Sequence, residues 1–574
     1  MCDTGWGKYQ QFDKVELADD PGVSSRTEWW CDCDYPGRCT ANGVYNFGSL
    51  GFLHQDDLLF TKKGGINGSI LYSVKGKNNE YNSEHYLIYL KGDYYQRGYA
   101  HGYLLADEIV ELFEKYFYGA WFRNNIACGQ GMGSAYTYLG NPEYSEYAPK
   151  VGYRGLYDYY KDNVNRYHFS ANDLQELQGM LDGIRTRRGL NLNFGRQLDL
   201  DDLKMIQLEA DWTQYTADYI FNYPTYVYCS ADTFSGSFTG SGSPVSWRNL
   251  DYPFEPFIDT QCDLYHTIFL VENEAGFRYI NILRPGSIGV ASGFNQNGVF
   301  IGLDSTQETL SSRGNKNYLH ELSSGRYVTL LFLRELLEKD NIDDLQSIIA
   351  GKGFTTAYVP TVTDLYFPEH IGAFPQSADV LHNVNSYLTA YGHPFCTSSY
   401  DENDVDEMML EEFYLLEDYT LKDFVNLKGY NSVDAEAAYN IDRGWLKNVN
   451  ILVWKIDPGD GSSTQKTNTR TGYTKVTFDS GTLDFVAGFG TKTMDPINEL
   501  YVKPLSYNFE ELFAAIDVSS GDVNGDGLIN VQDIQACVNH ILGTQDWGEA
   551  GDVNNDGAVN VLDVQTIVNI ILGG

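Results

Sequence analysis

The chain has 574 residues, with 78 acidic and 40 basic side chains and a formal net charge of −38. Such a charge argues against nucleic acid or anionic membrane as a partner, because its long-range field repels both. Hydrophobic residues make up 43% and aromatic residues 14% of the chain, which is typical of globular proteins. A chain of this length is expected to form two or three domains. The sequence contains no run of 18 apolar residues that would predict a membrane span.

Residues 1–84 are rich in glycine and asparagine, and we expect an irregular extension there with one strand at 68–76. Four of the nine cysteines crowd into this region, at Cys2, Cys31, Cys33 and Cys39. Their spacing allows a metal site, but disulfides are favoured if the protein is exported. The residues after Met1 lack the apolar segment of a signal peptide, so an export signal would have to have been removed.

Helical patterns dominate the next part of the chain. A strand at 85–92 is expected to run into a helix at 94–117, whose apolar residues share one face. A second helix is predicted at 171–187, with Ser170 as its N-cap, and a third at 200–212.

The pattern then changes to strands. Asn295 to Gly298 is a strong hairpin turn signal. A helix returns at 326–340, among strands predicted at 227–234, 244–252, 265–273, 277–286, 378–388, 448–456 and 473–490. This order predicts an α+β fold of stacked sheets with helices outside.

One cysteine has chemically suggestive neighbours. Cys229 lies at the start of the first β-hairpin, and the returning strand carries Arg248 and Asp251. A strand pair can bring these side chains together. A cation would stabilise the nucleophilic thiolate, and the carboxylate could hold an ammonium group or orient the arginine.

These residues resemble the cysteine class of N-terminal-nucleophile (Ntn) hydrolases, specifically the acyl-CoA:6-aminopenicillanic acid acyltransferase-like family. Relatives include choloylglycine hydrolases, acid ceramidase and phospholipase B-like proteins. The similar segments read "CSA", "WRNLDY", "LKGDYYQRGYAHGYLLADEI" (90–109), "LQELQGMLDGI" (174–184) and "SGFNQNGVFIGLDS" (292–305). The resemblance covers roughly residues 85–390 and implies a four-layer αββα sandwich.

The resemblance also implies self-cleavage of the Tyr228–Cys229 bond. It would divide the chain into a helical part at 85–228 and a catalytic core at 229–518. Cys229 would be the nucleophile and its freed α-amino group, with an ordinary pKa of about 8, the base. Arg248 would orient thiolate and substrate, and Asp251 would hold the ammonium group.

Two further residues fall at oxyanion positions of the family. Asn385, in "VNSYL", would donate a hydrogen bond to the oxyanion. Asp304 aligns where the family usually has asparagine. A carboxylate there would repel an oxyanion unless protonated, so either the alignment is off or a backbone N–H serves instead. No cofactor is expected for catalysis.

The C-terminal segment contains two loops with the spacing of calcium ligands. Short oxygen-bearing side chains and one backbone carbonyl recur at positions 1, 3, 5, 7, 9 and 12, with glycine at position 6 for the turn. These residues are Asp522, Asn524, Asp526, Leu528, Asn530 and Asp533, then Asp552, Asn554, Asp556, Ala558, Asn560 and Asp563. An apolar stripe at helical spacing follows each loop. Two structural Ca²⁺ ions are therefore predicted.

The duplicated loop–helix pattern over 521–574 resembles the dockerin family, type I-like. This resemblance implies a module that folds with calcium and binds a cohesin domain on a scaffold or cell-surface protein, and hence an extracellular location. The recognition positions of the two loops would be Val531 and Gln532, and Val561 and Leu562, which are largely apolar.

Two functions remain open at this point. One is an exported amidase or acyltransferase acting on a non-peptide amide or thioester of a small acyl substrate. The other is an inactive binding module in which some of the 44 tyrosines form a glycan- or peptide-binding surface. The isolated His101, His266 and His320 are expected to be packed or surface residues, which argues against a zinc enzyme.

Overall fold

The computed structural model describes most of the two central sheets, the helices beside them and the C-terminal module. Continuous described segments are 52–77, 85–114, 161–193, 195–208, 267–305, 326–342, 474–489, 504–519, 529–545, 547–554 and 558–572, with shorter segments between them. The expected elements are compared with the structure over these residues alone, and every structural statement below refers to them.

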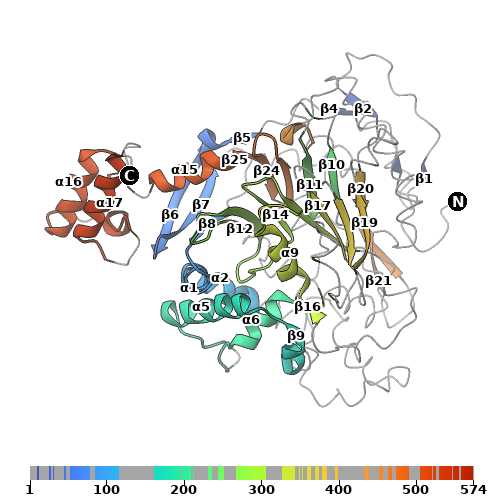
Figure 1. The fold of residues 1–574 in the computed structure, drawn as a ribbon, viewed down its shortest axis with the longest axis horizontal. Helices are drawn as coiled ribbons and strands as arrows, with labels where there is room; N and C mark the ends of the chain where they lie inside the picture. Colours follow the sequence, from blue (N-terminus) through green and yellow to red (C-terminus); the bar gives the residue numbers. More distant parts are fainter. Residues whose placement is uncertain are drawn as a thin grey trace.

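A ten-stranded sheet forms the centre of the molecule (Figure 1). Its spatial order is β19 (Ala378–Asn383), β18 (Glu369–Ala373), β17 (Tyr358–Thr363), β15 (Phe300–Ser305), β14 (Ser292–Asn295), β13 (Arg278–Leu283), β12 (Thr267–Glu272), β8 (His85–Lys91), β7 (Ser69–Gly76) and β6 (Leu58–Ile66). All neighbours are antiparallel except β8 and β12, which are parallel. This parallel pair joins the N-terminal strands β6 to β8 to the later strands, which begin at β12.

A seven-stranded sheet lies against it. Its order is β20 (Phe395–Ser398), β10 (Ser230–Phe234), β11 (Val245–Leu250), β23 (Thr474–Asp479), β24 (Asp484–Phe489), β25 (Leu505–Asn508) and β5 (Leu53–His54). Smaller two-stranded pairs are β1 (Gln10–Gln11) with β3 (Trp30–Cys31), β2 (Ser25–Thr27) with β4 (Val44–Asn46), β9 (Tyr167–His168) with β16 (Arg326–Tyr327), and β21 (Leu452–Ile456) with β22 (Ser463–Thr467).

Alternating residues of the central strands fill two separate cores. In β8, Leu87 and Tyr89 face the second sheet, whereas Ile88 and Leu90 face the helices. The core between the sheets stacks Phe294 on Phe478, with ring centroids 4.1 Å apart. At the inner strands β8, β12 and β13 both faces of the larger sheet are buried, so these strands consist mostly of apolar residues, and strand alternation assigns each side chain to a layer.

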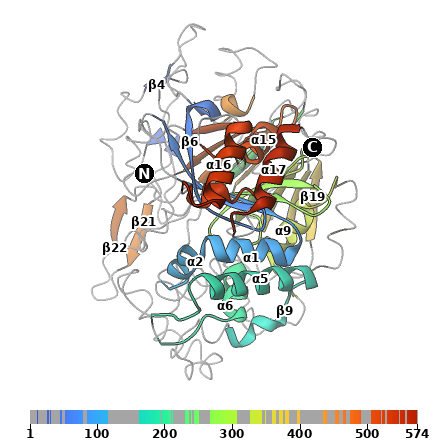
Figure 2. The same cartoon turned by 90° about the vertical axis from the view of Figure 1, so that its left-hand side faces the viewer.

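Helices cover the outer face of the larger sheet. They are α1 (Tyr94–Leu104), α2 (Ala106–Leu112), α5 (Ala171–Arg187), α6 (Leu200–Gln207) and α9 (Thr329–Leu337), and Figure 2 shows α1, α2, α5 and α6 gathered on one side. Beyond the smaller sheet, Ala435 of a short helical segment packs against Val486. The predicted α+β sandwich of stacked sheets with helices outside is confirmed.

The α1–α5 contact is a close approach of two backbones. A Cβ added at Gly98 would lie 1.9 Å from the Glu176 carbonyl oxygen, and one added at Gly179 would lie 2.2 Å from the Tyr95 carbonyl oxygen. Gly102 and Gly183 repeat the arrangement one turn further on. Only glycine permits this separation, which explains why glycines recur at four-residue spacing in both helices.

The helix α15 (Phe509–Ser519) closes one end of the core between the sheets and leads to the C-terminal module. That module contains α16 (Val531–Ile541) and α17 (Val561–Leu572), which form a separate pair in Figure 1. Short 3-10 helices occur at Gln55–Asp57, Val164–Arg166 and Gly548–Gly551.

Two expectations require correction. Residues 53–76 are not an irregular extension, because β5, β6 and β7 pair within the two main sheets. The helix expected at 94–117 is interrupted at Leu105, whose φ of −116° and ψ of 28° depart from helical values, so α1 and α2 are separate elements. The hairpin at Asn295–Gly298 is confirmed: the Asn295 side chain binds the turn and the carbonyls of Leu337 and Lys339.

Candidate active site and docking module

The first β-hairpin of the predicted catalytic core is present. β10 and β11 are antiparallel, and their register pairs Ser230 with Asn249 and Ala231 with Arg248. Cys229 immediately precedes the first residue of β10 in the sequence. The two strands are inner members of the smaller sheet, flanked by β20 and β23. The hairpin is therefore held on both sides by other strands.

Among the predicted catalytic residues, Arg248 is the one whose side chain the structure describes. It is only 2% exposed. Its Nε donates to the carbonyl oxygen of Leu303, 2.7 Å away, and its Nη1 donates to Ser292 Oγ, 2.8 Å away. Leu303 is on β15 and Ser292 is on β14, so the guanidinium crosses from the smaller sheet to the larger one. A cation held between stacked sheets can stabilise a thiolate there.

The structure describes little of the other predicted catalytic residues. Tyr228, Cys229, Asp251 and Asn385 lie outside the described residues. Asp304 lies on β15, where it pairs with Val359, next in sequence to the Leu303 carbonyl that binds Arg248; its side chain is not described. The roles assigned to these residues remain predictions.

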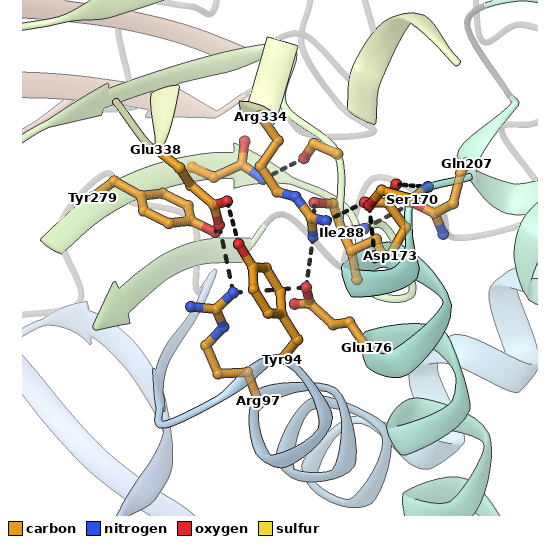
Figure 3. A network of polar contacts seen from close by, with 12 residues as sticks. Tyr94, Arg97, Ser170, Asp173, Glu176, Gln207, Tyr279, Ile288, Arg334 and Glu338 are labelled. Carbon is orange, nitrogen blue, oxygen red and sulfur yellow. Dashed lines mark hydrogen bonds and ion pairs between the residues drawn. The ribbon is translucent and has the colours of Figure 1, made fainter. Parts of the chain in front are cut away.

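Sequence reasoning missed a buried charge network in the helical layer (Figure 3). Arg334 of α9 binds Glu176 of α5, with Nη1 and Oε2 2.6 Å apart, and also binds Asp173. Arg97 of α1 lies 3.4 Å from Glu338, measured from Nη2 to Oε1. Tyr94 and Tyr279 donate to the same Glu338 carboxylate. The network thus joins α1, α5, α9 and β13.

The electrostatics of this network favour a structural role. Burial alone would lower the pKa of Arg334, but the carboxylates of Glu176, Glu338 and Asp173 raise it above its ordinary value. Burial, followed by the Glu338 charge, raises the pKa of Tyr94 to about 12. Arg334 therefore stays charged and Tyr94 stays neutral near neutral pH. Groups that keep one protonation state suit packing between helices better than proton transfer.

The histidine prediction is confirmed for His101. Burial lowers its pKa to about 3, and its Nε2 accepts a hydrogen bond from the Gly286 N–H at 3.0 Å. It is a neutral packed residue of the helical layer. His266 and His320 lie outside the described residues.

A row of tyrosines on α1 bears on the binding-module alternative. The rings of Tyr95, Tyr99 and Tyr103 follow one another with centroids 6.4 and 6.2 Å apart and interplanar angles of 27° and 15°. The Arg187 guanidinium lies 5.3 Å from the Tyr103 ring centroid. Because these rings contact one another and an arginine, part of their surface is already engaged within the protein, which does not favour sugar stacking.

The two C-terminal loops repeat one geometry around their final residue. Asp533 accepts from the N–H groups of Asn524 and Asn530 at 3.1 and 2.8 Å. Asp563 accepts in the same way from Asn554 and Asn560, at 3.0 and 2.7 Å. Both carboxylates are fully buried. In each loop, therefore, both oxygens of the final carboxylate accept backbone N–H groups of residues earlier in the same loop. Asp522, Asp526, Leu528 and Asp556 lie outside the described residues.

The module also exposes apolar side chains. Val531, Val561 and Leu562 are 71%, 71% and 56% exposed, at the start of the two helices as predicted, and Gln532 is exposed beside them. Leu542 and Leu572 are 68% and 77% exposed at the helix ends. Such exposed apolar residues are typical of a protein-binding surface.

Comparison with known proteins identifies the C-terminal module. Residues 520–572 match the Dockerin type I domain family, whose members generally bind calcium and pair with cohesins. No curated protein matches the chain. Of the described helices, none is long and apolar enough to cross a membrane.

Among solved structures, the chain is similar to an N-acylethanolamine-hydrolyzing acid amidase ortholog from Caenorhabditis elegans, with 13% identity, a TM-score of 0.29, and coverage of 44% of this chain and 93% of that one. Two variants of the conjugated bile acid hydrolase from Clostridium perfringens are also similar. Their identities are 9% and 8%, their TM-scores 0.27 and 0.23, with coverage of 49% and 46% of this chain and 93% and 89% of theirs.

Proposed function

We propose that the protein is an exported, self-processing cysteine hydrolase of the Ntn type, acting on a non-peptide amide or thioester and held on a cohesin partner by its C-terminal module. One observation carries the proposal. A buried arginine, Arg248, sits on the strand paired with β10, which begins directly after Cys229, and its guanidinium lies between two stacked sheets.

The register supports the nearness of Cys229 and Arg248. Paired residues of antiparallel strands share a face, and so do residues two apart on one strand. Ala231 pairs with Arg248, so Cys229, two residues earlier, is expected on the Arg248 side of the sheet. Diagonal neighbours of this kind have Cα atoms about 7–8 Å apart, which long side chains span.

The chemistry needs one thiol for two reactions. In the first, Cys229 Sγ attacks the carbonyl carbon of Tyr228, the C–N bond breaks, and the nitrogen takes a proton to become an α-amino group. Water then hydrolyses the resulting thioester. In the second, the amine accepts the thiol proton and the thiolate attacks the substrate acyl carbon. The substrate C–N or C–S bond then breaks, and the leaving amine or thiol takes the proton from the α-ammonium group. Water or another acceptor finally attacks the acyl thioester, which releases the acyl group and restores the Cys229 thiol.

The remaining roles are those that the family resemblance implies. Arg248 stabilises the thiolate, Asp251 holds the α-ammonium group and Asn385 donates to the oxyanion. An ionised Asp304 only accepts hydrogen bonds and cannot donate one to an oxyanion. A backbone N–H at that position, or a protonated Asp304, would have to serve.

Two Ca²⁺ ions are proposed for the C-terminal module, one for each loop, and they would stabilise its fold. Asp533 and Asp563 would ligate them together with the other oxygen-bearing residues of the loops. The apolar residues Val531, Val561 and Leu562, with Gln532, are proposed to contact the cohesin. Such a partner places the protein outside the cell.

The proposal is tested on the purified full chain by intact mass and N-terminal sequencing. The larger fragment should begin Cys-Ser-Ala-Asp. Cys229→Ala should remain uncut and inactive, whereas Cys229→Ser should be processed slowly, because a hydroxyl has a much higher pKa than a thiol. Cys537→Ala is the matched control, since Cys537 is a buried cysteine of the C-terminal module, and its processing should be normal. Full activity of Cys229→Ala would refute the proposal and favour the inactive binding module.

A further inference from the structure

The C-terminal module follows the body, meaning the two main sheets with their helices, almost without a linker. α15 ends at Ser519, and Gly521 already lies among apolar side chains of the module. A Cβ added at Gly521 would be 2.8 Å from Ile529 Cδ1 and 3.1 Å from Ile570 Cδ1. Only Ser520 stands between this glycine and the helix in the sequence. A connection of one residue has none of the reach of a flexible linker.

The helix that carries this connection, α15, is fixed to the body. Phe513 and Ile516 are buried in the core between the two sheets. Arg278 of β13 holds the helix from the larger sheet: its Nη1 lies 3.7 Å from Glu510 Oε2, and its guanidinium carbon lies 5.1 Å from the centroid of the Phe513 ring. The module is therefore attached to a helix that is itself held in place.

A cleft of about 440 Å³ lies between the module and the body. One wall comes from the β6–β7 turn, the end of β8, the start of α1 and α15, and the other comes from the second calcium loop; Figure 1 shows the module beside α15, β6 and β7. The lining includes Asn67, Lys91, Gln96 and Ile516 on the body, and Val553 and Asn554 on the module. No described residue of the first loop lines this cleft. The two loops therefore differ in their surroundings, although they repeat one internal geometry.

Asn554 connects the cleft to the predicted metal ligands of the second loop. It is position 3 of that loop, and its N–H donates to Oδ1 of Asp563, the carboxylate at position 12, at 3.0 Å. Metal binding orders the residues that supply its ligands. The wall formed by Val553 and Asn554 would therefore take its observed shape when this loop holds an ion.

We propose that the second calcium loop is seated on the body and that calcium in this loop fixes the orientation of the module. The inference rests on the two Ca²⁺ ions proposed above and adds an orienting effect to one of them. Calcium in the first loop stabilises the module itself. With the second loop loaded, the exposed Val531 and Val561 point in one direction relative to the two sheets, so the body is held at a defined angle on its cohesin partner.

Small-angle X-ray scattering of the full-length chain in Ca²⁺ measures the seating through the maximum dimension and the radius of gyration. Asp556→Ala removes a predicted ligand of the second loop, and Asp526→Ala removes its counterpart at position 5 of the first loop. Asp556→Ala should increase both dimensions, because an unseated module samples positions further from the body. Asp526→Ala is the matched control and should leave both dimensions close to those of the wild type.

A second variant keeps both calcium loops intact. Residues 521–574 contain eight acidic side chains and no lysine or arginine, so a negative charge on the body wall should repel the module at low ionic strength. Gln96→Glu supplies this charge and keeps the cap of α1, since glutamate can accept from the Asp93 N–H as Gln96 does. Gln96→Glu should increase the maximum dimension in saturating Ca²⁺. Gln175→Glu, on an exposed residue of α5 outside the cleft lining, should not.

Calorimetry on the same samples counts the bound Ca²⁺ ions and separates the two proposals. Two ions in the wild type, together with wild-type scattering by both Asp556→Ala and Gln96→Glu, would overturn the seating and leave the calcium proposal standing. A larger expansion in Asp526→Ala than in Asp556→Ala would also overturn the seating. A folded wild-type chain that binds no calcium would overturn both.

Discussion

Gly179→Ala tests whether the α1 and α5 backbones are in direct contact, because two effects of opposite sign compete at this position. In an isolated helix, alanine is more favourable than glycine by about 1 kcal/mol. In this protein the new Cβ would lie 2.2 Å from the Tyr95 carbonyl oxygen and 2.8 Å from the Tyr99 backbone nitrogen. Both neighbours are backbone atoms, so no side chain can rotate away.

The magnitude follows from the contact. Restoring an ordinary carbon–oxygen contact of about 3.2–3.4 Å requires α1 and α5 to separate by roughly 1 Å. Overpacking of this kind costs about 1–3 kcal/mol, and more where backbone must move. We therefore expect a net destabilisation of about 2 kcal/mol despite the gain in helix propensity. The unfolding entropy of a body this large is about 1 kcal/mol/K, so the unfolding temperature should fall by roughly 2 °C.

Thermal unfolding of the full chain provides the assay, with Gly189→Ala as control. Gly189 has a φ of 80° and no atom within 4 Å of an added Cβ, so its substitution tests backbone conformation without contact. The double variant of Gly98 and Gly179 should cost less than the sum of the single variants, because both act on one interface. The reasoning fails if Gly179→Ala is as stable as wild type or more so.

Two further predictions concern pH and calcium. Burial raises the pKa of the Asp211 carboxyl to about 7, well above its ordinary 3.8. The contribution of Asp211 to stability is therefore present below about pH 4 and is lost as the pH rises towards 7. Asp211→Asn should flatten the pH dependence of the unfolding free energy over that range. Excess EDTA should make residues 521–572 sensitive to limited proteolysis, as should Asp522→Ala combined with Asp552→Ala, and a module that stays resistant in EDTA would contradict the calcium reading.

The sequence predicted correctly the elements that begin or end at capping or turn residues. The helix Ala171–Arg187 has its expected bounds because Ser170 caps it and Asp173 completes a capping box. The hairpin at Asn295 follows from its turn residues. The interruption at Leu105 has no such signal, since neither glycine nor proline occurs there. It could not be predicted from the helical periodicity that runs through it.

The candidate site was only half predictable for a similar reason. Arg248 belongs to a motif with local pattern, and its strand pairing follows from a hairpin. Its partner Ser292 is 44 residues away on the other sheet, and Arg334 is 158 residues from Glu176. Contacts between distant elements depend on how the layers stack, and no periodicity within one element encodes that.

These distant contacts also connect the motif glycines to the proposed site. The buried segment that leads into β14 is held by the helical layer: Arg334 Nη1 donates to the Ile288 carbonyl at 3.1 Å, and the Gly286 N–H binds His101. Four residues after Ile288 comes Ser292, which contacts Arg248. Because His101 of α1 and Arg334 of α9 hold this segment from the helical layer, we expect the close α1–α5 packing at the glycines to contribute to where Arg248 sits. The recurrence of glycine in those helices is then explained by packing that supports the site, with no direct part in the chemistry.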